Sequence, residues 1–580
     1  MHKAHRSLAP YLIDRGGLLG LCALIAYIAL ASPHLVAADN AEFATLGALG
    51  GVAHPSGYPS YVLWLRAWSW LPGASPAHTA AIATAVLGAL AVVVLHAACR
   101  AWGARPIAAT ATVAIIAAAP LVLELHSEAE VFAMNNLIAA LVLWLAAANG
   151  PLRGRRRGVA LGVIAGLGLA DHLSCALLAP IGLLGVVRSA RESRPTTYAW
   201  ALLGLVVGLL PYGYLFVADG PASWGTVSSL DGLLATILRR EYGGLSLVPG
   251  GPDIAWTTSV AAWLATLARS WLWIFALAGL AMLPIRIWRP TGETRWAWAL
   301  LTLSFVLTGP ALASRFNVDP HGIGLYICRR FHLLPALLLA IPVAAALDLA
   351  FAGITRPIFA TVLATAGFVA LSLVALPRLL RVHSPAMELG VRNLLRSLPP
   401  AAIVVVISED QCFGGRYLQL ARGERPDVAL VCSEMLRRDW YRAGWAARHL
   451  VLPFAAGAEL RDVLLRTGRP VFVDRGLTAV LAGAPSYPFG VVSRLLPATD
   501  RPPSPSEIAV INRDLFRAFA LDYVHPYKDD DFAAVAHRRY TATWAAIANL
   551  LDAAGDPDGA HDAVEVARSL QPIQDHGPGW

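Results

Sequence analysis

Long apolar stretches recur throughout the first two thirds of the chain, and they constrain its fold more than any other feature of the sequence. A helix needs about 20 apolar residues to cross the roughly 30 Å hydrocarbon core of a bilayer, where only helices and closed barrels satisfy their backbone hydrogen bonds. Hydrophobic residues make up 57% and charged residues 14% of the chain, whereas soluble domains carry about 25% charged residues. We therefore predict a mainly helical, polytopic membrane protein.

Eleven stretches qualify as predicted spans, and the fifth and sixth are short enough to form a re-entrant pair instead. The predicted spans are Gly17–Ala38, Thr79–Ala98, Ile107–Leu123, Val131–Ala148, Val159–Ala170, Leu173–Val187, Tyr198–Ala218, Ser259–Leu283, Trp296–Ala313, Phe331–Phe351 and Ile358–Leu376.

The placement of arginines predicts the orientation, because short loops rich in Lys and Arg stay in the cytoplasm. Sixteen Lys and Arg residues, from Lys3 to Arg356, lie in loops on the side of the N-terminus, and six lie in the opposite loops. We predict a multi-pass protein of the inner (plasma) membrane, with a cytoplasmic N-terminus and an extracytoplasmic C-terminal part beginning near Pro377. A cleaved signal peptide ending at Val36-Ala37-Ala38 is the alternative for the first span.

Charge and cysteine content exclude other classes of protein. The net charge of +8 comes mostly from the arginines on the cytoplasmic side, which indicates contact with anionic lipid headgroups and not with nucleic acid. Three of the six cysteines fall in predicted spans and Cys328 falls in a loop, so the cysteines form no disulfide framework. Cys412 and Cys432 fall outside the membrane, where thiols can oxidise, and a bridge between them stays open.

The composition changes after Arg381, where charges and prolines return and apolar runs shorten to strand length. We predict a helical membrane domain at 1–380, an extracytoplasmic α/β domain at 381–530 and a helical hairpin at 531–580 that resembles one tetratricopeptide unit. The hairpin should pack on the α/β domain, since a single repeat cannot bury its own face. The predicted strands are Ala402–Ser408, Val428–Cys432, Val471–Asp474 and Gly490–Leu496, and the predicted helices include Met387–Leu398 and Glu434–Arg448.

The first outer loop carries two carboxylates, Asp39 and Glu42, three residues apart at the end of the first predicted span. On a helical turn they face the same way, and a carboxylate there can serve as general base for a hydroxyl acceptor. A solvated pair of acids at a helix end is the alternative. In the same loop, His54 and Tyr58 offer hydrogen bonds within a turn fixed by prolines and a glycine.

Further ionisable residues fall at the outer ends of later spans, where such groups tend to face a cavity and to be functional. An acidic cluster with no basic neighbour in the sequence precedes the fourth span, and Asp171-His172 separates the two short spans. Metal binding by the cluster is a weak alternative, because its His and Glu residues have mixed spacing. The cluster comprises Glu124, His126, Glu128 and Glu130.

Paired arginines occur twice on the outer side, against the orientation rule: Arg239-Arg240 in the long fourth loop, and Arg329-Arg330 before the tenth span. A phosphate of a lipid carrier would hold such arginines through charge-assisted hydrogen bonds. Contact with lipid headgroups is the alternative.

Several motifs in order give a family resemblance. Asp-x-x-Glu at Asp39, His-Pro-x-Gly-Tyr-Pro at His54, Glu-Val-Phe at Glu130, Trp-Gly at Trp224 and Arg-Glu-Tyr-Gly at Arg240 resemble the DUF2723 family of protein O-mannosyltransferase-like proteins. The resemblance implies a GT-C fold, which is a bundle of membrane helices with an active site at its outer face.

The same resemblance implies roles for individual residues. Asp39 would be the catalytic base with Glu42 beside it, and His54 and Tyr58 would lie in the same pocket. Glu130 matches the second acidic position of the family, and Arg240, Glu241 and Tyr242 match its long-loop motif. From the charged residues of the outer loops themselves, we also expect substrate contacts from Glu128, His172, Arg239 and Arg330.

The reaction implied is an inverting transfer of a hexose, mannose in the family, from a polyprenyl-phosphate donor to Ser or Thr hydroxyls of an exported protein. Asp39 would take the proton of the acceptor hydroxyl while the arginines stabilise charge on the departing phosphate. No cofactor is required, and no divalent metal. Asn40, Ala41, Ser56 and Asp171 depart from residues frequent in the family, which leaves the sugar and the acceptor open.

Two other functions remain open. A transferase of the same fold could act on a cell-envelope glycan or lipid. A transporter of lipid-linked saccharides would use the same arginines without chemistry, but the internal repeats typical of transporters are absent from the sequence.

Overall fold

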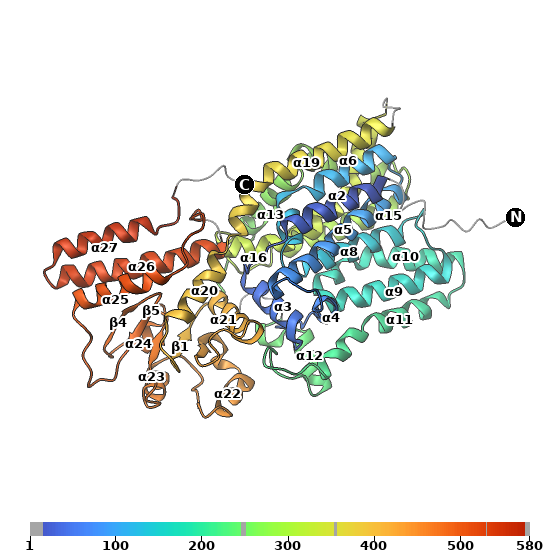
Figure 1. Ribbon diagram of the computed structural model, residues 1–580. Coiled ribbons are helices and arrows are strands. Elements are labelled where there is room, and N and C mark those ends of the chain that lie inside the picture. Colours follow the sequence, from blue (N-terminus) through green and yellow to red (C-terminus); the bar gives the residue numbers. More distant parts are fainter. Residues whose placement is uncertain (1–14, 245–250, 353–356, 529–530, 575–580) are drawn as a thin grey trace. The chain divides into compact units, whose positions relative to one another are not determined.

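A computed structural model describes residues 15–244, 251–352, 357–528 and 531–574, and the chain divides into two compact units (Figure 1). The first unit comprises Met1–Ser32, Gly50–Asp219 and Val227–Leu379. The second unit comprises the remaining segments, Pro33–Leu49, Gly220–Thr226 and Leu380–Trp580. The last segment of the second unit starts at Leu380, and two short earlier segments also belong to this unit. The predicted division into three domains stays a prediction.

The first unit is helical. Its helices are α2 (Arg15–Leu30), α4 (Pro59–Trp68), α5 (Pro76–Ala101), α6 (Pro106–Ala117), α7 (Pro120–His126), α8 (Phe132–Ala146), α9 (Gly154–Asp171), η1 (Leu173–Leu178), α10 (Ala179–Glu192), α11 (Thr197–Gly208), η2 (Leu210–Phe216), α12 (Leu230–Ile237), η3 (Arg240–Tyr242), α13 (Trp256–Ser270), α14 (Ile274–Trp288), α15 (Arg295–Val306), η4 (Leu307–Ala311), α16 (Ile323–Phe331), α17 (Leu333–Leu338), α18 (Ala340–Ala350) and α19 (Pro357–Val382).

Within the described residues, four helical segments are long and apolar enough to cross a membrane: Pro76–Ala101, Leu173–Glu192, Thr197–Phe216 and Ala364–Ser397. Three bent pairs, α6 with α7, α13 with α14, and α16–α17 with α18, raise the number to seven if each pair is one span. Two shorter apolar helices, Gly16–Leu30 and Phe132–Ala146, come in addition. The chain is thus a multi-pass membrane protein, and the number of eleven spans stays a prediction.

Three predicted spans are pairs of helices bent by more than 40°. Ile107–Leu123 bends by 69° before Pro120, because proline cannot continue the hydrogen-bond ladder of the preceding helix. Ser259–Leu283 bends by 108°, where Leu272 and Trp273 have positive φ. The third, Phe331–Phe351, bends by 44°, and its first helix already begins at Ile323.

Two expectations about the loops are corrected by the structure. Cys328 lies in helix α16 and not in a loop. The two spans predicted to be short are longer than expected, at Gly154–Asp171 and Leu173–Glu192. Lys3, Arg6 and Arg356, which contributed to the predicted orientation, lie outside the described residues.

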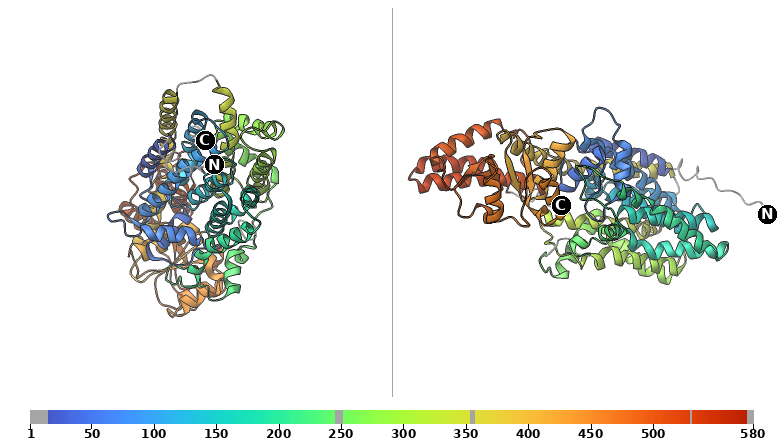
Figure 2. Two further views of the ribbon diagram at one scale, coloured as in Figure 1. Left: turned by 90° about the vertical axis from the view of Figure 1, so that its right-hand side faces the viewer. Right: turned by 90° about the horizontal axis from the view of Figure 1, so that it is seen from below.

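Helices α9 and α11 pack closely, side by side in both directions of view (Figures 1 and 2). A Cβ atom added to Gly162 would lie 2.0 Å from the Ala201 carbonyl oxygen, and one added to Gly208 would lie 2.2 Å from the Val163 oxygen. Small residues let helix backbones approach each other in lipid, where van der Waals packing replaces the hydrophobic effect. These glycines therefore fix the position of α9, which ends at Asp171 beside His172.

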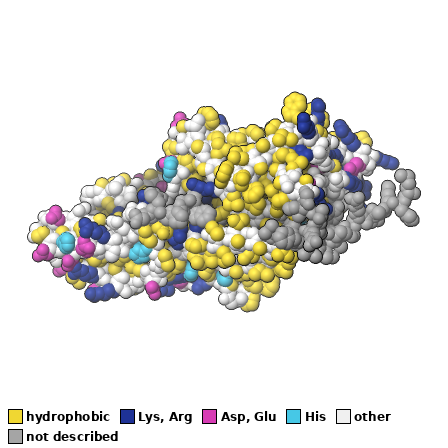
Figure 3. All heavy atoms as spheres, turned by 90° about the horizontal axis from the view of Figure 1, so that it is seen from above, with side chains coloured by type: hydrophobic (Ala, Val, Ile, Leu, Met, Phe, Trp, Pro, Cys, Tyr) yellow, Lys and Arg dark blue, Asp and Glu magenta, His cyan; other side chains and the backbone are white. Residues whose placement is uncertain are grey.

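The surface of the first unit has the character expected of a face in lipid. Hydrophobic side chains gather over its helices in Figure 3, and large apolar residues are exposed along α2 and α19, including Leu21, Ile25, Leu373 and Val374. Exposed apolar patches of this extent are rare on soluble monomers.

The second unit contains a five-stranded mixed sheet in the order β2-β1-β3-β5-β4, in which β1 is parallel to β2 and β3 while β5 is antiparallel to β3 and β4. Helices α25 and α26 pack against β4, and α26 against α20 and α27. Its elements are α3 (Ala38–Leu49), α20 (Ala386–Ser397), β1 (Ile403–Val406), α21 (Glu409–Arg416), η5 (Tyr417–Ala421), β2 (Ala429–Cys432), η6 (Ser433–Arg437), α22 (Asp439–Ala446), α23 (Ala458–Leu465), β3 (Val471–Val473), α24 (Thr478–Leu481), β4 (Ser486–Phe489), β5 (Val492–Leu495), α25 (Pro505–Ala518), α26 (Asp531–Ala553) and α27 (Pro557–Ser569).

The four predicted strands are present, together with β4, which the sequence analysis missed because Pro488 interrupts its apolar pattern. The predicted helix Glu434–Arg448 is divided into η6 and α22. Cys412 and Cys432 form a disulfide bond, which settles the question left open by their positions. Helices α26 and α27 form the predicted hairpin in the tail, and its tetratricopeptide-like character stays a prediction.

Candidate active site

The turn before α4 brings His54 and Tyr58 together. The Gly57 amide donates to the His54 carbonyl at 2.8 Å, and Gly57 and Tyr58 have φ of 89° and 44°, a region that glycine adopts freely. Pro59 then starts α4 at a position where its missing N–H costs no hydrogen bond. The Tyr58 hydroxyl and His54 Nε2 lie 3.1 Å apart as a result.

His172 is fixed by its neighbours between α9 and η1. The backbone N–H of Ser174 donates to His172 Nδ1 at 3.1 Å, so in the neutral ring the proton sits on Nε2. Asn135 of α8 donates to the Ser174 hydroxyl at 2.8 Å, and that hydroxyl lies 2.8 Å from Nδ1. The ring thus presents an N–H donor in a defined orientation.

Aromatic rings surround His172. Its ring centroid lies 5.1 Å from that of Phe132, 5.5 Å from Phe331 and 5.9 Å from Tyr58. The ring of Tyr242, from the long loop, lies 6.5 Å from that of His54. The predicted residues His54, Tyr58, His172 and Tyr242 therefore form one group, although they are distant in the sequence.

Arginines flank this group. Arg239 and Arg330 both interact electrostatically with His172, and the Arg239 guanidinium lies 5.0 Å from the centre of the Tyr242 ring. Arg239 adopts a positive φ of 52°, which turns it away from the direction of α12. Arg240 instead pairs with Asp231 at 2.9 Å, with about half of its side chain exposed, and Glu241 is exposed in η3. The structure thus brings Arg239 to the ring of Tyr242, and the roles of Arg240 and Glu241 stay predictions.

The acidic cluster has basic partners that are far away in the sequence. Arg330 Nη1 lies 2.8 Å from Glu130 Oε1, with side chains 11% and 1% exposed. Arg329 pairs with Glu124, and Arg378 lies 3.9 Å from the same carboxylate. The Tyr326 hydroxyl lies 3.3 Å from Glu128 and 3.2 Å from Glu130. The cluster has no basic neighbour in the sequence, and its partners come from distant helices: α16 supplies Arg329, Arg330 and Tyr326, and α19 supplies Arg378.

Asp39 and Glu42 belong to the second unit. They lie on helix α3 and not in a loop, since α2 already ends at Leu30. Glu42 is buried, and so are most residues of α3. The structure therefore places these two acids on a helix that packs against α21 and η5.

Several residues of these clusters were not predicted, namely Phe132, Tyr326, Phe331 and Arg378. Apolar and aromatic residues inside spans give no sign of their partners in a single sequence. Among the described residues, no group of three or more His, Cys, Asp or Glu side chains is arranged to hold a metal ion.

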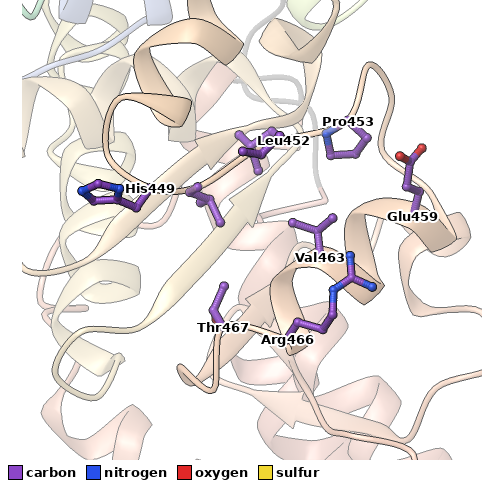
Figure 4. Close-up of a pocket in the computed structure, with 9 residues that line it drawn as sticks. His449, Leu452, Pro453, Glu459, Val463, Arg466 and Thr467 are labelled. Carbon is purple, nitrogen blue, oxygen red and sulfur yellow. The ribbon is translucent and has the colours of Figure 1, made fainter.

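A surface groove of about 460 Å³ also lies in the second unit. It runs between the segment from His449 to Pro453 and helix α23, with Glu459 and Arg466 on the helical side (Figure 4). None of the predicted site residues lines it.

Comparison with known proteins agrees with this architecture. Residues 39–195 match the family described as the protein O-mannosyl-transferase TMEM260 N-terminal domain. The chain is 25% identical over 461 residues to the protein O-mannosyl-transferase TMEM260 of Mus musculus, which covers 75% of this chain and 65% of the mouse protein. It is 24% identical over 292 residues to the protein of the same name from Dictyostelium discoideum, covering 46% of this chain and 35% of that one. In both cases the chain spans less than two thirds of its relative.

Among solved structures, ArnT from Cupriavidus metallidurans bound to undecaprenyl phosphate has a similar fold. The TM-score is 0.51 at 14% sequence identity, covering 86% of this chain and all of ArnT. The chain therefore shares the overall fold of this helical membrane protein. The chain is thus similar to the protein O-mannosyl-transferase TMEM260 N-terminal domain over residues 39–195, and to the named protein O-mannosyl-transferases at 24 to 25% identity.

Proposed function

We propose that this protein transfers a hexose, mannose by its relatives' names, from a polyprenyl-phosphate donor to Ser or Thr hydroxyls of exported proteins. The observation that carries the proposal is that two guanidinium groups lie against the aromatic rings around His172 and His54, that of Arg239 5.0 Å from the centre of the Tyr242 ring and that of Arg330 5.9 Å from the centre of the Phe132 ring. Two guanidinium groups beside a fixed N–H donor form a site for an anionic group, and the flanking rings suit an apolar or sugar moiety. The undecaprenyl phosphate bound to ArnT, whose fold this chain shares, supports a lipid phosphate as that group.

Each residue has a chemical task in this reaction. Arg239, Arg330 and His172 Nε2–H stabilise the negative charge that develops on the departing phosphate. Glu130 holds Arg330 in place, and Tyr326 bridges Glu128 and Glu130. Asp39 acts as the general base that removes the proton of the acceptor hydroxyl as its oxygen attacks the anomeric carbon, with inversion.

The role of Asp39 is tested with Asp39→Asn in the full chain. Purified protein is incubated with polyprenyl-phosphate mannose and a Ser/Thr-rich peptide pool, and hexose on peptide is measured by mass spectrometry. Loss of a general base lowers the rate by about 10² to 10⁴, while binding of the lipid phosphate should be retained.

The matched control is Asp253→Asn, which removes an exposed carboxylate of the first unit. It should transfer hexose at the rate of the unaltered protein. Equal activity of Asp39→Asn and Asp253→Asn would exclude Asp39 as the base. If hexose were found on a glycan or a lipid but not on peptide, the acceptor would be that glycan or lipid and not a protein hydroxyl.

A further inference from the structure

We propose that Arg416 is a positioning residue for the transfer reaction, which holds the Asp39-bearing helix α3 and the Pro221–Gly225 segment in one arrangement on the α/β unit. The inference rests on the proposed function, since it concerns the helix that carries the proposed base. Arg416 lies at the end of α21, within the second unit, and the sequence analysis did not single it out.

Arg416 is hydrogen-bonded to one of these segments and linked electrostatically to the other. Its Nη2 donates to the carbonyl oxygen of Pro221 at 3.0 Å. The charge of Glu42, three residues after Asp39, acts on the same guanidinium, and α3 packs against α21. A guanidinium has five N–H donors in a rigid plane, so it can bind a carboxylate and a carbonyl group together, whereas a lysine is a single point charge.

The guanidinium group of Arg416 is partly buried and stays positively charged. Burial lowers the pKa of Arg416, while Tyr441 and Glu42 oppose that effect. A guanidinium nevertheless stays protonated in proteins. Removing it would leave the buried Glu42 without this opposite charge, which is costly for a carboxylate that little water reaches.

Helix α21 is itself anchored at two further points. The Arg539 guanidinium of α26 binds the Asp410 carboxylate at 2.6 and 2.9 Å, and Cys412 is bonded to Cys432 at the end of β2. The position of Arg416 is therefore defined by the sheet and by α26, and the α/β unit determines where α3 lies.

The Trp-Gly motif is held by the same part of the molecule. The Trp224 ring lies 6.0 Å from that of Phe413 in α21 and 5.9 Å from that of Trp440. Gly225 has a φ of 72°, and a Cβ there would lie 3.1 Å from Trp440. Arg416 thus fixes the start of a segment whose next residues pack closely on the α/β unit.

The first test needs no activity. Hydrogen exchange of the full chain in detergent is measured by mass spectrometry for Arg416→Gln, with Arg461→Gln as matched control. Arg461 also pairs with a carboxylate, Asp462, and donates to a backbone carbonyl, that of Ala482, but it contacts neither α3 nor the 220–226 segment. We expect about tenfold faster exchange in peptides covering 38–49 and 220–226 for Arg416→Gln alone. Unchanged exchange in both peptides would overturn the proposal, whatever the enzymatic activity.

The second test is kinetic. Arg416→Gln should lower kcat for peptide glycosylation about 10- to 100-fold with little change in the KM for donor, because the base is displaced while the phosphate site stays intact. Arg416→Lys should recover part of the loss, and the effects of Arg416→Gln and Glu42→Gln should not be additive. A rise in donor KM at constant kcat, or full additivity, would contradict the positioning role. Absence of activity in the unaltered protein would instead reject the proposed function and leave the exchange result to decide on Arg416.

Discussion

At the scale of single residues, the pairing of Arg330 with Glu130 determines the character of the site. Both side chains are nearly inaccessible to solvent. The cost of removing two charges from water largely cancels their attraction, so a buried ion pair needs good geometry and neighbouring hydrogen bonds to be stable. Tyr326 supplies one of these neighbours by reaching both Glu128 and Glu130. The arginine is thereby kept beside Phe132, at 5.9 Å from its ring centre, with the rest of the aromatic group.

Arg330→Gln should lower kcat/KM for the donor by about 10² to 10³, the cost of removing one preorganised electrostatic contact. It should also lower the melting temperature, because Glu130 would stay buried without its partner. Arg330→Lys keeps a charge beside Glu130 and should fold, yet it should remain impaired in donor binding. Donor titration in a transfer assay is the measurement, with the exposed Arg315→Gln as control. Normal donor KM for both Arg330 variants would show that this arginine does not bind the phosphate.

Tyr326→Phe tests the support of the two carboxylates. The hydroxyl group is within hydrogen-bond distance of both, and a hydrogen bond to a charged group contributes about 1.5 to 3 kcal/mol. We expect a loss of activity of about 10- to 100-fold together with a lower melting temperature. Tyr198→Phe, at an exposed position of α11, serves as control. Unaltered kinetics of Tyr326→Phe would mean that Arg330 alone holds Glu130.

At the scale of elements, the predictions from the sequence were wrong where tertiary contacts determine the direction or the place of a helix. The strands β1, β2, β3 and β5 could be predicted from short apolar runs, because buried strands leave that pattern. The bends between α6 and α7 and between α13 and α14 could not be placed by hydropathy, which is insensitive to the direction of a helix. The assignment of α3 to the second unit depends on its contact with α21, over 350 residues later in the chain.

The contact of α26 with the segment before it gives a prediction of pH dependence. His537 lies among the rings of Tyr523, His525 and Tyr540. Burial lowers the pKa of His537 to about 4 from its usual 6.5; the Leu570 carbonyl raises it and His525 lowers it further. The unfolded chain, in which this pKa is ordinary, therefore binds more protons between pH 6.5 and 4.

The free energy of unfolding of the α/β unit should thus fall as the pH falls through this window, by at most about 1.4 kcal/mol per pH unit from this group. His537→Gln should make the dependence shallower. Thermal unfolding of the full chain, followed by near-UV circular dichroism from pH 7 to 4.5, measures it, with the exposed His561→Gln as control. An identical slope for His537→Gln would show that His537 is not buried in its neutral form.

The disulfide between Cys412 and Cys432 anchors α21 and gives a further prediction. The bond joins residues 20 apart, and closing a loop of about this length stabilises a fold by roughly 3 kcal/mol in the chain-entropy model. Replacing both cysteines by serine should lower the melting temperature, and transfer activity should fall in parallel if α21 positions α3. Cys22→Ser, at a free thiol of α2, is the control. A destabilised variant with full activity would show that the disulfide bond stabilises the fold but does not help to position α3 for the reaction.

At the scale of the whole molecule, a resemblance to known proteins was easier to predict than the geometry. The order of the motifs indicated the resemblance that the comparisons report over residues 39–195. The residues His54, Tyr58, His172 and Tyr242 lie in one region of the first unit, while their participation in a site stays a prediction. Their partners Tyr326 and Phe331 could not be inferred, because a single sequence gives no sign of which distant helix, here α16, lies against the site. The catalytic role of Asp39 remains a prediction from the family resemblance.

The central claim is that this membrane protein transfers a hexose from a lipid phosphate to protein hydroxyls. It is tested most directly by incubating the purified full chain with polyprenyl-phosphate mannose carrying an isotope label and with a Ser/Thr-rich exported polypeptide. Mass spectrometry then locates the label. We predict labelled mannose linked to Ser or Thr, and loss of this product in Asp39→Asn. Label that remains on the lipid, with a folded protein that binds the donor, would contradict the claim.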